Sequence, residues 1–243
     1  MQVRFPNLRR MSIHGQDHLK MIWPKELVTN SFSKLKTLIV ERCEDSNIFP
    51  PHMLIGLQNL EELQISNCDS TKEVYVSQGV NVKEISFQMR YLCLYNLPGL
   101  LHVWRLESLD PEVIFTFKNL HEVRVSNCES LRSLFPVSVA KHLSQLGLLE
   151  ICDCRVLEEI VGMEKGLKTR TTFKFPQLRS LILKRLPQLK SFYGGEYKSQ
   201  WPLLKDLNIS NCDRLKSIGS DAPWNQNKKG LFPVFFLEKV RAL

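Results

Sequence analysis

The residues that could do chemistry are spread thinly along this sequence of 243 residues. A histidine needs a nearby nucleophile or acid to form a catalytic group, and no such partner recurs at a fixed spacing from any histidine. The phosphate-binding pattern G-x-x-x-x-G-K-[ST] and the patterns G-x-S-x-G and H-E-x-x-H are all absent. The sequence therefore predicts no enzyme and no nucleotide or other cofactor. The six histidines are His14, His18, His52, His102, His121 and His142.

Cys152 and Cys154 are the only two thiols close together in the sequence. If this segment is a strand, alternation points Cys152 outward and Cys154 inward, so one metal ion cannot contact both. The adjacent acids Glu61 and Glu62, and Glu158 and Glu159, are more typical of a solvated face than of an acid–base pair. No metal site is predicted.

The clearest feature of the sequence that holds these residues is an internal repeat. In the stretch 117–134 the apolar residues fall at offsets 0, 3, 6, 8, 11, 14 and 17, which fits neither one long helix nor one long strand. The same offsets return from Leu143, Phe175 and Trp201. Five of the seven cysteines share the offset-11 slot, and leucine followed by proline fills it in two other repeats, so the slot is predicted to be a buried core position holding free thiols. The five are Cys43, Cys68, Cys128, Cys154 and Cys212.

The pattern L-x-x-L-x-L-x-x-C of a leucine-rich repeat is complete at Leu60–Cys68. Its L-x-L core alternates with period two, as in a short strand with the leucines on one face. We therefore predict an α/β solenoid: a leucine-rich-repeat horseshoe with a concave parallel β-sheet and an irregular or short-helical convex side. The repeat array of about eight units covers 1–218, and 219–243 is a partial ninth repeat or a C-terminal cap. The eight strand anchors are Met11, Leu38, Leu63, Leu92, Val123, Leu149, Leu181 and Leu207.

The convex side is the variable half of each repeat. A proline followed by helix formers predicts a short helix within 135–143, and Pro50–Gly56 resembles it. Glycine-rich segments at 162–166 and 194–196 are predicted to be loops.

The charge and composition of the sequence limit the classes of partner and the cellular location that we predict. The net charge is +8, but lysine and arginine are distributed through every repeat and never form a block, so nucleic-acid binding is not predicted. No apolar run reaches the length of a membrane span or a signal peptide, which predicts a soluble protein that stays off membranes. The odd cysteine count and a single N-x-[ST] sequon at Asn208 favour a reducing, cytoplasmic location.

The concave face is the expected site of function, because its side chains are not used by the core. Three columns of outward residues follow from the repeat, and most members are small or polar. Aromatic and charged residues of the kinds enriched at protein interfaces gather on strands four to seven. The predicted partner-binding residues are Tyr91, Tyr95, Arg124, Glu150, Ile182 and Lys184.

Three phrases of the sequence resemble a known family. The segments 134–141 and 149–161, together with Phe175-Pro176-Gln177-Leu178 and its continuation to Phe192, are similar to the C-terminal repeats of plant intracellular nucleotide-binding leucine-rich-repeat disease resistance proteins of the coiled-coil type. The resemblance covers roughly 5–218. In that family the repeats sense pathogen effectors or guarded host proteins and hold the nucleotide-binding module inactive. The chain carries neither that module nor the coiled-coil segment, so nucleotide binding is not implied.

The resemblance implies a protein-recognition module of a plant immune receptor, with a pathogen effector, a guarded host protein or the receptor's nucleotide-binding module as partner. An alternative is a leucine-rich-repeat substrate adaptor of a ubiquitin ligase. At the ends, Phe5 begins a repeat without a capping helix, and Val234 to Ala242 reproduce the start of a ninth repeat. The isolated chain is therefore expected to self-associate, with 239–242 pairing beside Asp206–Ser210, unless 231–243 forms a cap.

Overall fold

The computed structural model describes residues 5–15, 23, 31–45, 47–49, 51–76, 84–105, 114–163, 171–195, 197–215 and 218. The predictions for 219–243, including the edge strand and the cap, lie outside these residues. In the described part of the chain no helix is long and apolar enough to cross a membrane.

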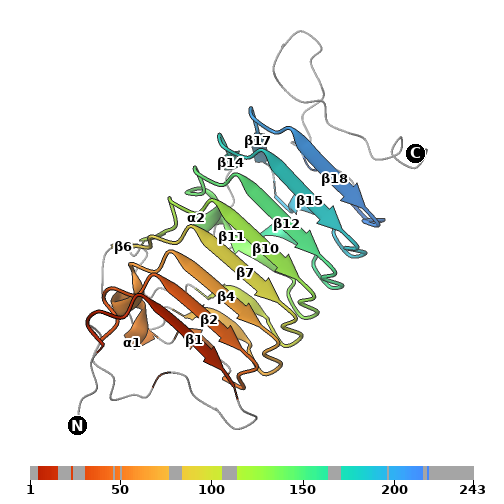
Figure 1. The fold of residues 1–243 in the computed structure, drawn as a ribbon. Coiled ribbons are helices and arrows are strands. Elements are labelled where there is room, and N and C mark those ends of the chain that lie inside the picture. Colours follow the sequence, from red (N-terminus) through yellow and green to blue (C-terminus); the bar gives the residue numbers. More distant parts are fainter. Residues whose placement is uncertain are drawn as a thin grey trace.

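One parallel sheet of eight strands runs the length of the molecule (Figure 1). Every strand has five residues, and the L-x-L core of each repeat forms its centre. The predicted solenoid with a parallel sheet is confirmed. In spatial order the strands are β1 (Arg10–His14), β2 (Thr37–Glu41), β4 (Glu62–Ser66), β7 (Tyr91–Tyr95), β10 (Glu122–Ser126), β12 (Leu148–Cys152), β15 (Ser180–Lys184) and β18 (Asp206–Ser210).

The strands pair in strict register, so equivalent residues of successive repeats are neighbours. Met11 pairs with Leu38, Leu38 with Leu63, and the anchors continue in this way to Leu207. From β2 to β15 the two inward residues of each strand are at most 2% exposed, whereas those of β1 and β18 are only half-buried. The leucine positions therefore form one continuous core, as the repeat predicted.

Shorter strands form a second set of parallel ladders, seen behind the sheet in Figure 1. Each lies in the half of the repeat that follows the cysteine slot. The sequence predicted an irregular convex side and not these strands. Gly162, predicted in a loop, is the last residue of β13, while Gly194 and Gly195 lie in a bend as expected. One ladder joins β3 (Asn47–Phe49), β5 (Glu73–Val76) and β8 (His102–Arg105); a second joins β11 (Ser133–Pro136), β13 (Glu159–Gly162) and β16 (Ser191–Tyr193); two pairs join β6 (Glu84–Ser86) to β9 (Ile114–Thr116) and β14 (Thr171–Lys174) to β17 (Tyr197–Gln200).

Helical structure in the described residues is confined to two short segments. The helix α1 (Pro51–Leu54) continues into a 3₁₀ turn, η1 (Ile55–Leu57), and α2 (Val137–Ala140) follows Pro136. Both lie where a proline followed by helix formers predicted them. Val137, Val139 and Ala140 are buried, so α2 closes the core on this side.

Aromatic rings fill the core between the main sheet and the shorter strands. Tyr75 and Trp104 stack with their centroids 5.0 Å apart, and Phe87 and Phe117 stack at 4.6 Å. Trp104 meets Phe117 edge to face at 4.3 Å. Such pairs add about 0.5–1.5 kcal/mol each beyond the area they bury. The aromatic residues therefore tie neighbouring repeats into one core.

A tight turn follows the sheet strands from β2 onward, and its first residue has a left-handed backbone conformation. The φ angles of these seven residues lie between 53° and 57°, although none of them is glycine. The backbone N–H of Asn96, for example, donates to the carbonyl of Ser126 in the next repeat at 3.0 Å. We call these seven the exit-turn residues: Arg42, Asn67, Asn96, Asn127, Asp153, Arg185 and Asn211.

Candidate protein-recognition surface

The outward residues of the eight-stranded sheet form the concave face, in the three columns that the sequence predicted. The register places Cys93, Arg124, Glu150 and Ile182 side by side in the middle column. Tyr95 and Lys184 lie in the third column, separated by Ser126 and Cys152. The fold thus brings the six predicted partner-binding residues onto four adjacent strands, β7, β10, β12 and β15.

Tyr91 and Tyr95 are the most conspicuous residues of this face. They are 43% and 52% exposed, on the same side of β7 and two positions apart from Cys93. The guanidinium of Arg90 lies 5.7 Å from the centroid of the Tyr91 ring, a cation–π distance. Exposed tyrosines offer large contact area at a small entropic cost, so this pair suits an anchor for a protein partner.

Arg124 is held by two carboxylates. Its Nε donates to Glu122 of the same strand, and its Nη1 donates to Glu150 Oε2 on β12 at 2.8 Å. The three side chains carry a net negative charge, and the guanidinium is fixed in place before any partner arrives. Sequence reasoning found Arg124 and Glu150 but missed Glu122, whose spacing of two residues from Arg124 on a strand puts both on one face.

Cys93 lies half-buried between the two tyrosines. Its pKa is raised, first by burial and then by three nearby carboxylates, against the lowering effect of Arg124. A thiol that stays protonated is a poor nucleophile. Cys93 therefore adds a half-buried thiol to the packing of this face.

Ile182 and Lys184 complete the predicted set on β15, where both are half-buried. Ile39 on β2 and Leu148 on β12, the other apolar residues at outward positions, are half-buried as well. The aliphatic residues of the concave face are thus partly covered by their neighbours, whereas the side chains of Tyr91 and Tyr95 are exposed.

The described residues contain no group of three or more His, Cys, Asp and Glu side chains that could hold a metal ion. All seven cysteines are free, and the five slot cysteines are buried. Cys154 donates to the carbonyl of Cys152 at 3.3 Å, whereas the Cys152 thiol lies 3.9 Å from Glu150 Oε1 on the outward face. Burial is also the main cause that raises the pKa of Cys43, to about 11. The slot thiols are core groups, as predicted.

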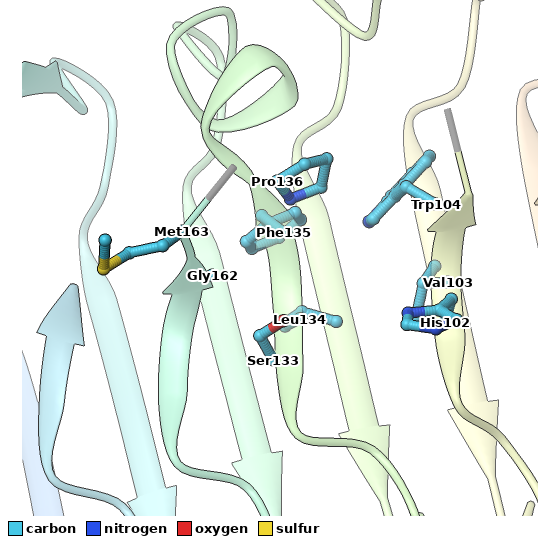
Figure 2. Close-up of a pocket in the computed structure, with 9 residues that line it drawn as sticks. All are labelled: His102, Val103, Trp104, Ser133, Leu134, Phe135, Pro136, Gly162 and Met163. Atoms are coloured by element: carbon cyan, nitrogen blue, oxygen red, sulfur yellow. The ribbon is translucent and has the colours of Figure 1, made fainter. Parts of the chain in front are cut away.

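A cavity of about 180 Å³ opens between β8 and β11, where the second row of strands is interrupted (Figure 2). Its walls include His102, Trp104, Phe135 and Gly162, and Met163 stands at the rim with 62% exposure. The Trp104 Nε1 is buried without a hydrogen-bond partner in the described structure. The lining contains the hydroxyl of Ser133 and no acidic residue, and the cavity is a local gap between two ladders.

A second hollow adjoins Tyr95 at the exit turns and was not predicted. It is open, measures about 600 Å³, and is lined by Asn127, Asp153, Arg155 and Arg185 together with Ser126, Pro187 and Gln188. The sequence did carry a signal: the residue before the cysteine slot is asparagine or aspartate in five repeats, a composition typical of left-handed turns.

An all-parallel solenoid with one wide exposed sheet face is the architecture of a leucine-rich-repeat domain, a fold used for recognition. The family model of plant disease resistance protein RPS2-like leucine-rich repeats matches residues 7–155 and 142–220. The chain belongs to this family.

Individual relatives agree with the family match. Disease resistance protein UNI of Arabidopsis thaliana is 26% identical over 192 residues, which is 78% of this chain and 18% of the relative. Disease resistance protein RGA2 of Solanum bulbocastanum is 29% identical over 75% of this chain and 19% of its own length. Disease resistance protein SUMM2 of Arabidopsis thaliana is 31% identical over 43% of this chain and 11% of its own length. The chain thus spans less than a fifth of each of these relatives, and no solved structure matches it.

Proposed function

We propose that this chain is the protein-recognition region of a plant immune receptor and that its partner binds the centre of the concave face. The observation that carries the proposal is the exposed Tyr91–Tyr95 pair beside the fixed Glu122–Arg124–Glu150 group. The partner is a pathogen effector, a guarded host protein or the receptor's own nucleotide-binding module.

The two parts of this surface supply different things. The tyrosines offer apolar area and hydroxyl groups, and truncating such an anchor typically weakens binding by 1 kcal/mol or more, about fivefold. The Glu122–Arg124–Glu150 group is already ordered, so little side-chain entropy is lost when a partner covers it. Affinity is thus expected from the tyrosines and orientation from the charges.

The matched relatives are named disease resistance proteins, which favours the receptor over a ubiquitin-ligase adaptor. The seven free cysteines suit a reducing compartment, so a cytoplasmic location is part of the proposal.

The test compares two pairs of residues at equivalent positions. Arg10 and His14 on β1 occupy the same two columns as Tyr91 and Tyr95 on β7, and all four are exposed. Pull-downs from plant cytosol would use the wild-type chain, a Tyr91→Ala/Tyr95→Ala variant and an Arg10→Ala/His14→Ala control, with recovered proteins quantified side by side.

We expect the tyrosine variant to lose specific proteins about fivefold or more and the control to retain them. An Arg124→Ala variant, compared with Ser12→Ala in the same column, should lose the same proteins to a similar degree. Equal recovery by the tyrosine variant and the wild type would place the partner on another surface.

A further inference from the structure

The side chains of the exit-turn residues form a hydrogen-bonded row that is interrupted once, and every donor in it belongs to the later of the two repeats. Asn96 Nδ2 donates to Asn67 Oδ1 at 2.9 Å, and Asn127 Nδ2 donates to Asn96 Oδ1 at 2.6 Å. Further along, Arg185 donates from Nε and Nη2 to the two carboxylate oxygens of Asp153 at 2.5 and 2.6 Å.

Between Asn127 and Asp153 this row cannot continue. Asn127 donates to Asn96 Oδ1, so continuing the row would require the next exit-turn residue, Asp153, to donate to Asn127. Asp153 offers only acceptors, because its pKa is lowered, first by the hydrogen bonds from Arg185, and it stays ionised at neutral pH. Asp153 therefore has no hydrogen to donate to Asn127, and both residues line the hollow beside Tyr95.

The charges around the exit turns divide into two halves. Near the N-terminal repeats, Arg42 stands among four acids: Glu41, Glu44, Asp45 and Asp69. Near the C-terminal repeats the balance reverses, with Arg155, Lys184, Arg185 and Arg214 against Asp153 and Asp213. The hollow lies at the start of the basic half.

Of the two arginines that line the hollow, Arg155 is the more exposed to a partner. Its side chain is 77% exposed, and its Nε lies 3.8 Å from Glu129 Oε1, a long contact between two exposed groups that contributes little. Arg185 keeps its Nη1 outside the pair with Asp153. Two guanidinium groups thus border the hollow with donors left over.

We propose that this hollow binds an acidic segment of the partner protein, whose carboxylates pair with Arg155 and Arg185. Backbone N–H groups of the segment satisfy the acceptors of Asn127 and Asp153, and its apolar atoms pack on Tyr95 and Pro187. The inference rests on the proposed function, because Tyr95 belongs to both surfaces.

A polypeptide fits this site better than a phosphate polymer or a lipid headgroup does. The hollow presents donors and acceptors together, and an acidic peptide carries both N–H groups and carboxylates. A phosphodiester backbone carries only acceptors along its length, so it cannot satisfy the acceptors of Asn127 and Asp153.

The binding test uses labelled decapeptides and the full chain, followed by fluorescence anisotropy. One peptide alternates glutamate and alanine around a central tyrosine, and a second replaces each glutamate with glutamine. The variants are Arg155→Gln and Arg185→Gln. Arg42→Gln is the matched control, because Arg42 occupies the same turn position with the same φ of 53° as Arg185.

We expect the glutamate peptide to bind at least fivefold more tightly than the glutamine peptide, and each of the two variants to weaken it about fivefold. Arg42→Gln should change its affinity by less than twofold. Raising the salt concentration should weaken the wild type more than either variant.

Equal affinities for the two peptides, or equal losses in Arg42→Gln and Arg155→Gln, would overturn the inference. So would tighter binding of single-stranded DNA or of anionic phosphatidylserine vesicles that is lost in the same two variants. If the peptide result fails while the Tyr91→Ala/Tyr95→Ala variant still loses its proteins, this inference falls and the proposed function stands. The reverse outcome would leave a peptide site without the proposed concave-face partner.

Discussion

On one side of the solenoid eight strands pair without a break, whereas on the other side the shorter strands form separate ladders of two or three. The segment from the strand anchor to the cysteine slot has the same length in every repeat in which the slot can be identified. Each strand of the concave sheet therefore pairs with the next strand in register. The other half of the repeat varies, and the anchors are 25 to 32 residues apart as a result. The half of the repeat that follows the cysteine slot therefore tolerates insertions. The half that forms the concave strand keeps its backbone fixed while its outward side chains change.

The largest effect that would test this contrast comes from the core. Leu149 lies under the unbroken sheet, and Leu134 lines the cavity between the two ladders (Figure 2). We expect Leu149→Ala to lower the free energy of unfolding by about 4 kcal/mol and Leu134→Ala by about 2 kcal/mol, within the usual range for buried leucines, because Leu134 has fewer neighbours to lose. Urea denaturation followed by circular dichroism measures both. Equal losses would mean that the interrupted side is as tightly packed as the sheet.

A smaller effect is expected from the exit turns that end the regular half. Asn96→Ala removes two side-chain hydrogen bonds and places alanine at a φ of 53°, so we expect a loss of about 2 kcal/mol. Asn96→Gly keeps the left-handed conformation accessible and should lose only about 1 kcal/mol. The same denaturation assay separates the two. If glycine and alanine cost the same, the backbone conformation contributes nothing to the regularity of this side.

The Asp153–Arg185 pair gives a pH-dependent test of the same turns. Because the folded-state pKa of Asp153 lies below its ordinary value of 3.8, its contribution is fully present above that value and is lost as the pH falls through the lower folded-state pKa. The pair is largely exposed, so the effect is below about 1 kcal/mol. The stability difference between wild type and Asp153→Asn should be larger at pH 7 than at pH 2. A difference that does not change with pH would mean that the pair adds nothing.

The reactivity of the cysteine thiols involves no change in stability, but it measures directly which cysteines are buried. In the folded protein at pH 8, Cys93 on the concave face should react first with a thiol reagent, because Cys93 is only half-buried and the slot cysteines are buried. Titration in denaturant without reductant should recover seven thiols. Recovery of only one to three would show that the slot cysteines form disulfides.

The regular side could be predicted from the sequence almost residue by residue, and the other side could not. Leu-x-Leu alternation identifies both the inward anchors and the outward columns, and the structure pairs Tyr91 with Glu122 and Tyr95 with Ser126 as those columns require. The shorter strands have no such alternation: the two central residues of β11, Leu134 and Phe135, are both buried, and β11 ends in a proline. A run of this kind carries no period for sequence reasoning to detect.

Some residues of the candidate site could likewise be predicted from the sequence, whereas the contacts between them could not. Tyr91 and Tyr95 could be predicted because they are aromatic residues in two columns of mostly polar residues. The partners of Arg124, and the junction between Asn127 and Asp153, depend on which side chains donate and which accept across neighbouring repeats. That information lies in the three-dimensional register and not in any one repeat.

The register has a consequence for how such a gene can change. Because each residue of a concave strand pairs with the equivalent residue of the next repeat, an in-frame recombination that deletes, duplicates or exchanges whole repeats leaves every main-chain bond of the sheet with a partner. The exit-turn side chains impose the one local condition, since asparagine next to asparagine and aspartate next to arginine must stay matched. Unequal crossing-over can therefore change the outward columns, where we propose that the partner binds, while the fold is kept.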